Sequence, residues 1–338
     1  MKSLLNHEPT LHSMKSLVAT RSPVQRNFPS SAAMTKIALA LFFLLGQASP
    51  GTAAGTGKTF ASAEEAVSAL VLATTAKDSN ALHALFGPAG EELENPDRIQ
   101  STNELDAFTA AFRQTNRLSR LSDSQFVLEV GSDLWPFPVP VVKKNGRWFF
   151  DTEVGKDELL GRRIGQNELF TLEVMRGYVD AQREYAGKDR DGDEVLEYAQ
   201  RISSSPNKTD GLYWPPELNN QESPLGPMVA DAQTEGYFVE PDADIAGPRP
   251  FHGYLFKILT RQTRDAPGGK HDYIVNGNMI LGFALVGWPA EYGSSGVMTF
   301  IVNQQGRVYQ KDLGEKTARI VKDMDAYDPD RSWRLSPD

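Results

Sequence analysis

The sequence predicts an α+β protein with two domains, each made of helices packed on an antiparallel sheet. In each half of the chain, apolar residues at helical spacing come first, and short segments rich in aromatic and β-branched residues follow. The 338 residues include 40% hydrophobic side chains, which is ordinary for a globular protein, and the length suits two domains. We predict domains at 58–163 and 164–334, behind a segment, 1–54, that we exclude from the fold.

Residues 34–54 have the pattern of a secretory signal peptide. Lys36 precedes an unbroken apolar run, Ile37 to Leu45, and small residues follow up to Ala54, after which we expect the leader to be cleaved. The run of nine residues is too short to cross about 30 Å of hydrocarbon. We therefore predict an exported protein, periplasmic or secreted, whose mature form does not span the membrane. Residues 1–33 are interpreted as an over-extended N-terminus.

Charge and cysteine content exclude several classes of function. The whole chain has a formal net charge of −9; residues 1–54 contain five basic and one acidic side chain, so their removal gives −13. This charge disfavours nucleic acid and anionic membranes as partners. Disulfides, thiol nucleophiles and zinc–thiolate sites are ruled out because the chain has no cysteine. We expect the partner to be an envelope protein or a small ligand.

Three helices are predicted at the start of the first domain. Ser62 and Glu65 form a capping box ahead of apolar residues at helical spacing. A second helix begins after Asp78 and stops at Gly87-Pro88, and a third follows Asn103. These helices are expected to cover one face of a sheet.

The spacing of apolar residues then changes to that of strands. Strands are predicted at 125–130, 138–143 and 147–151, with Lys144-Asn145-Gly146 as a type I′ hairpin signal between the last two. This order of helices and strands resembles the nuclear transport factor 2-like cone, a fold that often surrounds an apolar pocket.

A pocket inside the cone is one interpretation of the first domain's aromatic residues. Trp135 and Trp148 are candidates for its lining, and Asp151 is a candidate polar group. The alternative, which we favour, is that the tryptophans belong to the core and the aspartate to a turn or cap. His83 alone gives little support for acid–base chemistry in this region.

The second domain is predicted to begin with a helix that Asn167 caps and that runs to about Ala186. Five strand-like segments follow: 254–260, 271–275, 279–288, 297–302 and 307–313. Asn303–Gly306 is expected to join the last two as a hairpin. The intervening Ser203–Pro250 is rich in Pro, Asn, Gly and acidic residues, which predicts a long loop. Binding functions are common in such loops.

Long motifs in both halves resemble the exported bacterial proteins of domain-of-unknown-function family 2950. The resemblance runs from Phe60 to Trp333 and includes WPFPVPVVKKNGRWFFDTEVGKDELLGRRIGQNEL, YVDAQREYAGKDRDGDEVLEYAQR and PGGKHDYIVNGNMILGFALVGWPAEYG. It implies export and architecture and no particular activity. The second half also resembles the globular head of a type II secretion pseudopilin, although it lacks the apolar half of the pilin helix.

An acidic run is the one candidate metal site. Asp189, Asp191 and Asp193 stand at alternate positions around Gly192, and Glu197 is near. Carboxylates at this spacing offer a hard cation such as calcium several oxygen ligands. The glycine falls at the fourth position, whereas an EF-hand needs it at the sixth. A solvated acidic turn that binds no metal is the alternative, and no other cofactor is predicted.

Tyr213, Trp214 and Trp288 belong to an aromatic set with adjacent prolines. Such a set is found in glycan- or peptide-binding surfaces, and it also closes small sheets. The leading hypothesis is a non-catalytic binding or interaction protein. The alternative is a small-molecule carrier or enzyme that uses a pocket in the first domain.

Overall fold

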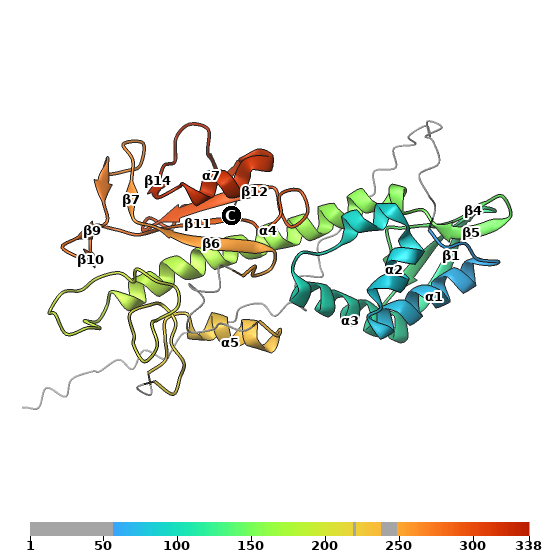
Figure 1. Ribbon diagram of the computed structural model, residues 1–338, viewed down its shortest axis with the longest axis horizontal. Coiled ribbons are helices and arrows are strands. Elements are labelled where there is room, and N and C mark those ends of the chain that lie inside the picture. Colours follow the sequence, from blue (N-terminus) through green and yellow to red (C-terminus); the bar gives the residue numbers. More distant parts are fainter. Residues whose placement is uncertain (1–56, 219–220, 238–248, 338) are drawn as a thin grey trace, which may run out of the picture. The chain divides into compact units, whose positions relative to one another are not determined.

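The computed structural model describes residues 57–218, 221–237 and 249–337 (Figure 1). These residues form helices and antiparallel sheets, so the predicted α+β class is confirmed. The predicted signal peptide and its cleavage site lie outside the described residues.

The first half of the described chain begins with helices. They are α1 (Ala63–Ala76), α2 (Ser79–Phe86), the 3-10 helix η2 (Pro88–Leu93) and α3 (Arg98–Gln114). The two predicted caps are confirmed: Ser62 Oγ accepts from Glu65 N at 3.1 Å, and Asp78 Oδ1 accepts from Ala81 N at 3.0 Å. The predicted start of α3 after Asn103 is wrong. The helix begins at Arg98 because the Asp97 carboxylate accepts from the first free N–H groups of that turn.

The first sheet has five antiparallel strands in the order β1-β2-β4-β5, with β3 paired to β2. They are β1 (Asn116–Ser122), β2 (Gln125–Val130), β3 (Trp135–Pro136), β4 (Val141–Lys144) and β5 (Arg147–Phe150). Asn145 and Gly146 have φ values of 53° and 79°, which confirms the type I′ hairpin. β1 was not predicted because its sequence, NRLSRLS, is polar and mostly exposed.

A single long helix, α4 (Thr152–Tyr185), follows the first sheet. The prediction that Asn167 caps a new helix is wrong, because Asn167 lies fully buried inside α4 and bonds to other segments through its side chain. The proposed boundary between 163 and 164 therefore falls within a continuous helix. The two-domain division stays a prediction.

The second half builds a five-stranded sheet in the order β15-β13-β12-β11-β6. Its strands are β6 (Tyr254–Leu259), β11 (Ala284–Pro289), β12 (Met298–Asn303), β13 (Tyr309–Asp312) and β15 (Arg334–Leu335). The hairpin predicted between the last two long strands is confirmed by the antiparallel pairing of β12 with β13. Every residue of β11 is buried because α4 and α7 (Thr317–Lys322) pack on opposite faces of the sheet (Figure 1).

Smaller elements surround this sheet. They are α5 (Gly226–Thr234), β7 (Arg261–Gln262), β8 (His271–Asp272), β9 (Ile274–Val275), β10 (Asn278–Met279), the 3-10 helix η3 (Gly314–Lys316) and β14 (Ala326–Tyr327). Apart from α5, the described part of Ser203–Pro250 has only turns, bends and isolated bridges, in keeping with the predicted long loop.

Candidate functional site

Aromatic rings fill the interior of the first half. Phe137 lies 6.3 Å from Phe86, 5.6 Å from Phe108 and 6.3 Å from Phe150, measured between ring centroids. Trp148 is 8% exposed and belongs to the same cluster, with Phe126 at 5.2 Å. These rings pack on one another within the hydrophobic cluster of the first half.

The other two candidates of the first half lie at its edge. Trp135 is partly exposed, and the guanidinium of Arg162 lies 4.8 Å from its ring centroid. Asp151 stands just before the first residue of α4, where burial raises the pKa of its carboxyl. Neither Trp135 nor Asp151 lines the pocket described below.

The predicted aromatic set of the second half is packed into that half's core. Tyr213, Trp214 and Trp288 are 7%, 1% and 8% exposed. The indole N–H of Trp214 donates to the Gln221 carbonyl at 2.9 Å, so its polar atom is also satisfied. These side chains therefore present little surface to a glycan or peptide.

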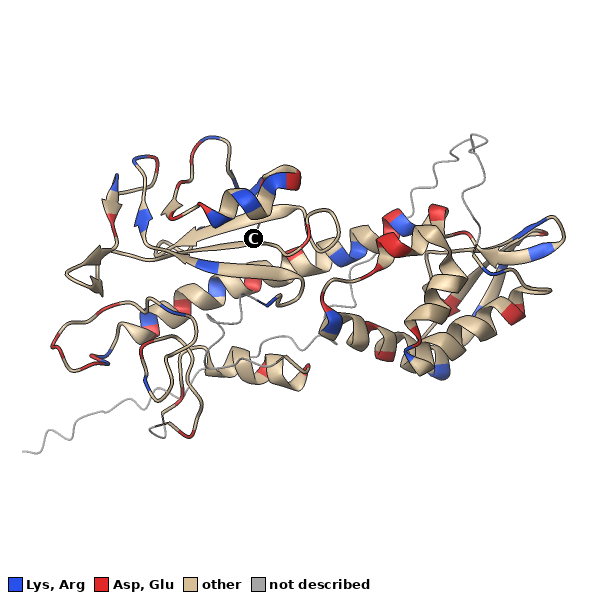
Figure 2. Ribbon diagram, viewed as in Figure 1, with Lys and Arg blue, Asp and Glu red and all other residues tan. Residues whose placement is uncertain are grey.

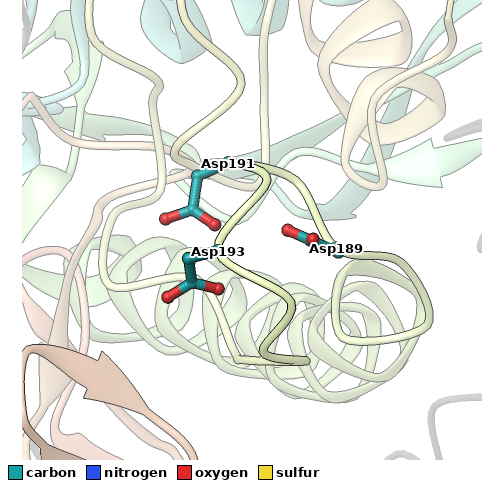
Figure 3. A group of neighbouring side chains, drawn as sticks. All are labelled: Asp189, Asp191 and Asp193. Carbon is teal, nitrogen blue, oxygen red and sulfur yellow. The ribbon is translucent and has the colours of Figure 1, made fainter.

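The acidic run forms an exposed loop directly after α4 (Figure 3). Carboxylate oxygens of Asp189, Asp191 and Asp193 lie within 4.8 Å of one another. Asp189 accepts from the backbone N–H groups of Gly192 and Glu194 at 2.7 and 3.0 Å, and these bonds lower the pKa of its carboxyl. The loop thus uses part of the cluster to hold its own backbone, as expected of an acidic turn.

Asp193 is engaged in the same way. Its Oδ1 accepts from Val195 N at 2.8 Å and its Oδ2 from Asn278 Nδ2 at 2.7 Å. Glu197 is not part of the close group; its Oε2 accepts from Met279 N at 3.2 Å. Calcium binding by these residues and its alternative, an acidic turn that binds no metal, both stay predictions.

A half-open polar pocket of about 410 Å³ lies beside this loop. It is lined by Tyr185, Arg190, Asp191, Glu197, Tyr198, Gln200, Arg201, Asn207, Lys208, Thr209 and Asp210, and we call it the polar pocket. The loop that follows α4 and contributes to this lining carries both acidic and basic residues (Figure 2). Of these lining residues, only Asp191 and Glu197 were predicted from the sequence as candidate site residues.

Arg190 lies in the lining of the polar pocket and contacts two aromatic rings. Its guanidinium carbon lies 5.0 Å from the ring centroids of both Tyr185 and Trp214, and its Nε donates to the Tyr185 carbonyl at 3.3 Å. Within the described chain, neither Nη atom of Arg190 is joined to a hydrogen-bond or ion-pair partner. Burial lowers the pKa of this guanidinium, although the group remains charged at neutral pH.

Glu197 carries negative charge into the same pocket. Burial raises the pKa of its carboxyl, the neighbouring Asp191 and Asp193 raise it further, and the Met279 N–H partly offsets them. Tyr185 is also affected: burial, with the nearby Glu197 carboxylate, raises the pKa of its hydroxyl to about 12. The hydroxyl therefore stays protonated and donates to the Thr209 carbonyl at 3.1 Å.

The sequence pattern of the family described as "Protein of unknown function (DUF2950)" matches residues 57–335. The chain belongs to this family. No curated protein and no solved structure shows significant similarity to it. The family resemblance drawn from the motifs is thus confirmed, whereas the pseudopilin and nuclear transport factor 2-like resemblances stay predictions. Among the described helices of this DUF2950 member, none has the length and hydropathy needed to span a bilayer.

A second polar cluster of this DUF2950 member is buried between α3, α4 and the segments near 237 and 253. Asp97 Oδ2 accepts from the Tyr237 hydroxyl at 2.7 Å and from Gly253 N at 3.2 Å. Gln100 Nε2 donates to Asn167 Oδ1 at 2.7 Å, and Asn167 Nδ2 donates to the Ser295 carbonyl at 2.9 Å. The polar groups of this cluster thus find hydrogen-bond partners within the protein, which favours a structural role for the cluster.

Proposed function

We propose that this DUF2950 member is an exported bacterial protein that binds a small polar ligand in the polar pocket and does not convert it chemically. The observation that carries the proposal is the pocket itself, because it gathers charged and hydroxyl groups from four segments around one hollow. Export is supported by the signal-peptide pattern at 34–54.

The lining favours binding over catalysis. It has no histidine, serine or cysteine, so a Ser–His or Cys–His pair is not available in it. Two of its members already form a closed arrangement: Arg201 Nη1 donates to Ser205 Oγ at 2.7 Å, and Ser205 N and Oγ donate to Asp210 at 2.7 and 2.8 Å. Groups fixed in this way position a ligand without reacting with it.

A ligand site in the first half has less support. The interior there is occupied by the rings around Phe137. An open depression beside α2, lined by residues such as Lys58, His83 and Glu91, is shallow and offers few converging groups. His83 Nε2 in this depression lies 2.8 Å from Glu94 Oε1, at the surface.

Binding is tested by measuring the thermal unfolding temperature of the purified protein with L-alanine, L-alanyl-L-alanine, maltose, succinate or putrescine at millimolar concentration. We expect at least one compound to raise this temperature, because a ligand that binds only the folded state stabilises it. The shift should vanish in the pocket variant Arg190→Met and persist in His83→Ala, which alters the other depression. Binding that survives Arg190→Met, or no shift with any compound, would contradict the proposal.

Export has its own test. The protein isolated from the bacterium should begin at Gly55 by N-terminal sequencing and should fractionate with periplasmic or culture-fluid proteins. A cytoplasmic form that retains Ile37 to Leu45 would exclude the proposed location.

A further inference from the structure

We infer that the polar pocket binds an amino acid or short peptide through its free carboxylate and its free ammonium group. The inference rests on the proposed function and names the chemical class of the ligand. Three observations support it: the lining has equal numbers of acidic and basic residues, the Nη atoms of Arg190 have no described partner, and the carboxylate of Glu197 is partly buried.

The charges of the lining balance. Its basic members are Arg190, Arg201 and Lys208, and its acidic members are Asp191, Glu197 and Asp210. A ligand with several charges of one sign would meet repulsion from half of these groups, whereas a zwitterion matches both. Arg201 and Asp210 are already linked through Ser205. Lys208 is exposed. Arg190 and Glu197 remain as the partly buried charges of opposite sign.

Arg190 is suited to a carboxylate. The guanidinium contacts the rings of Tyr185 and Trp214, and its Nε donates to the Tyr185 carbonyl, so its position is restricted. The two Nη atoms are left with N–H groups that no described residue accepts. A carboxylate can accept from both at once, in the bidentate geometry that guanidinium favours. Because the side chain is already ordered, little conformational entropy is lost when the ligand binds.

Glu197 is suited to an ammonium group. Its half-buried carboxylate has two other carboxylates near it, Asp191 and Asp193, and accepts hydrogen bonds from the Met279 N–H and the Gln200 side chain, neither of which carries a positive charge. A cation placed here would relieve both the burial of the charge and the repulsion. An ammonium group also has three N–H donors, so it can bond Glu197 and Asp191 together.

The volume agrees with a small ligand. About 410 Å³ lies within the roughly 300–1,000 Å³ of ordinary small-molecule sites. The pocket is half open, so one end of a short peptide can extend into solvent. Other residues of the lining, among them Asn207, Gln200 and Thr209, carry polar side chains of the kind that pair with a peptide bond.

Titration calorimetry on the full protein separates this ligand class from others. The probes are L-alanyl-L-alanine, its N-acetyl derivative without the ammonium, its C-terminal amide without the carboxylate, and maltose. We expect the unmodified dipeptide to bind, each blocked dipeptide to bind at least ten-fold more weakly, and maltose not to bind. Equal affinity for all three dipeptides would overturn the inference.

Two variants assign each end of the ligand. In Arg190→Met the dipeptide should lose at least ten-fold in affinity and the C-terminal amide should lose little. In Glu197→Gln the N-acetyl derivative should be the one that is little affected. Arg113→Met, on exposed α3 and outside the lining, is the control and should bind like the unchanged protein. Circular dichroism melts establish that each variant is folded, and Arg190→Lys should restore part of the affinity for the carboxylate.

The outcomes also separate the inference from the proposed function. If maltose, succinate or putrescine binds in an Arg190-dependent manner and the dipeptide does not, the ligand class is wrong and the binding function stands. If none of the probes binds, both are contradicted. If Arg190→Met weakens the binding of the C-terminal amide more than that of the other dipeptides, the two ends of the ligand are assigned the wrong way round. That result would overturn the inference.

Discussion

Gly253 lies where a side chain has no room. Its φ of +73° is in the left-handed region, and a Cβ atom would come within 2.5 Å of Asn167 Nδ2 and 2.9 Å of Ser295 Cβ. Its N–H donates to the buried carboxylate of Asp97. The glycine thus allows β6 to begin directly against α4, and this close approach fixes the position of the polar network around Asn167.

Replacing Gly253 with alanine should lower the free energy of unfolding by about 2–4 kcal/mol, because backbone strain adds to a clash with buried groups. Gly146→Ala is the matched control: its φ is +79°, and nothing lies within 4 Å of its Cβ position. It should cost only about 1–2 kcal/mol. Urea denaturation of both variants measures the difference, and equal costs would contradict the close packing at Gly253.

The carboxylate of Glu197, which we propose binds the ligand, should lower the stability of the free protein at neutral pH. Its folded pKa is raised, so the stability that the neutral carboxyl contributes is present below the unfolded pKa and is lost as pH rises through the folded value. Glu197→Gln cannot ionise. At pH 7 its free energy of unfolding should therefore exceed that of the unchanged protein by up to about 1 kcal/mol, after allowance for solvent screening. Near pH 4 the two free energies should be equal. Urea denaturation at both pH values tests this; a variant less stable at pH 7 would contradict it.

Local chemistry determined which residues could be predicted. Ser62, Asp78 and Asn145-Gly146 act on neighbours within three or four positions, so their roles follow from sequence spacing. Asn167 has the same preference for a helix start, but its partners are 67 and 128 positions away. The role of Arg190 could not be predicted from the sequence either, because its contact with Trp214 depends on how the loop folds. No local pattern indicates such partners.

At the scale of elements, α4 connects the two halves. It begins in the first half, at Thr152, and ends at Tyr185 in the lining of the polar pocket. Gly161 and Gly165 stand in its middle, and a Cβ at either would meet nothing within 4 Å. Glycine weakens a helix at such places because it loses more backbone entropy on folding than alanine does. We predicted a new helix at Asn167, just beyond these glycines, whereas α4 is continuous from Thr152 to Tyr185.

Gly161→Ala and Gly165→Ala should each raise the free energy of unfolding by about 0.5–1 kcal/mol. Gly155→Ala, in the first turn of the same helix, should lower it, because its Cβ would lie 2.6 Å from the Pro138 carbonyl oxygen and from Val139 Cα. Chemical denaturation measures the free energy of unfolding of the three variants. If α4 is continuous, this free energy rises in the first two variants and falls in Gly155→Ala. Destabilisation by all three would show that the glycines provide a needed break.

The acidic loop after α4 should fold without metal. Backbone N–H groups already stabilise Asp189 and Asp193, and the three carboxylates are exposed. We expect the thermal unfolding temperature to change by less than about 1 °C between millimolar calcium and EDTA, since a ligand that does not bind cannot stabilise the folded state. A larger calcium-dependent rise that Asp191→Asn removes would establish a calcium site.

At the scale of the whole molecule, the sequence predicted two separate halves because the repeated order of helices and strands suggests two cores. Two hydrophobic clusters are indeed present, one around Phe137 and one around Tyr254. What the sequence could not indicate is their connection, which is made by α4 and by buried polar side chains. Gln100 of α3 bonds to Asn167 of α4, and Asn167 bonds to the Ser295 carbonyl beyond β11.

We therefore expect both halves to unfold together and Asn167 to couple them. Asn167→Ala should lower the free energy of unfolding by about 2–4 kcal/mol, because it leaves the Gln100 amide and the Ser295 carbonyl buried without a partner. Asn116→Ala, which removes one exposed bond to the Phe112 carbonyl, should change it by less than about 0.5 kcal/mol. Scanning calorimetry should give one transition for the unchanged protein, whereas two transitions that Asn167→Ala leaves in place would show that the halves are independent domains.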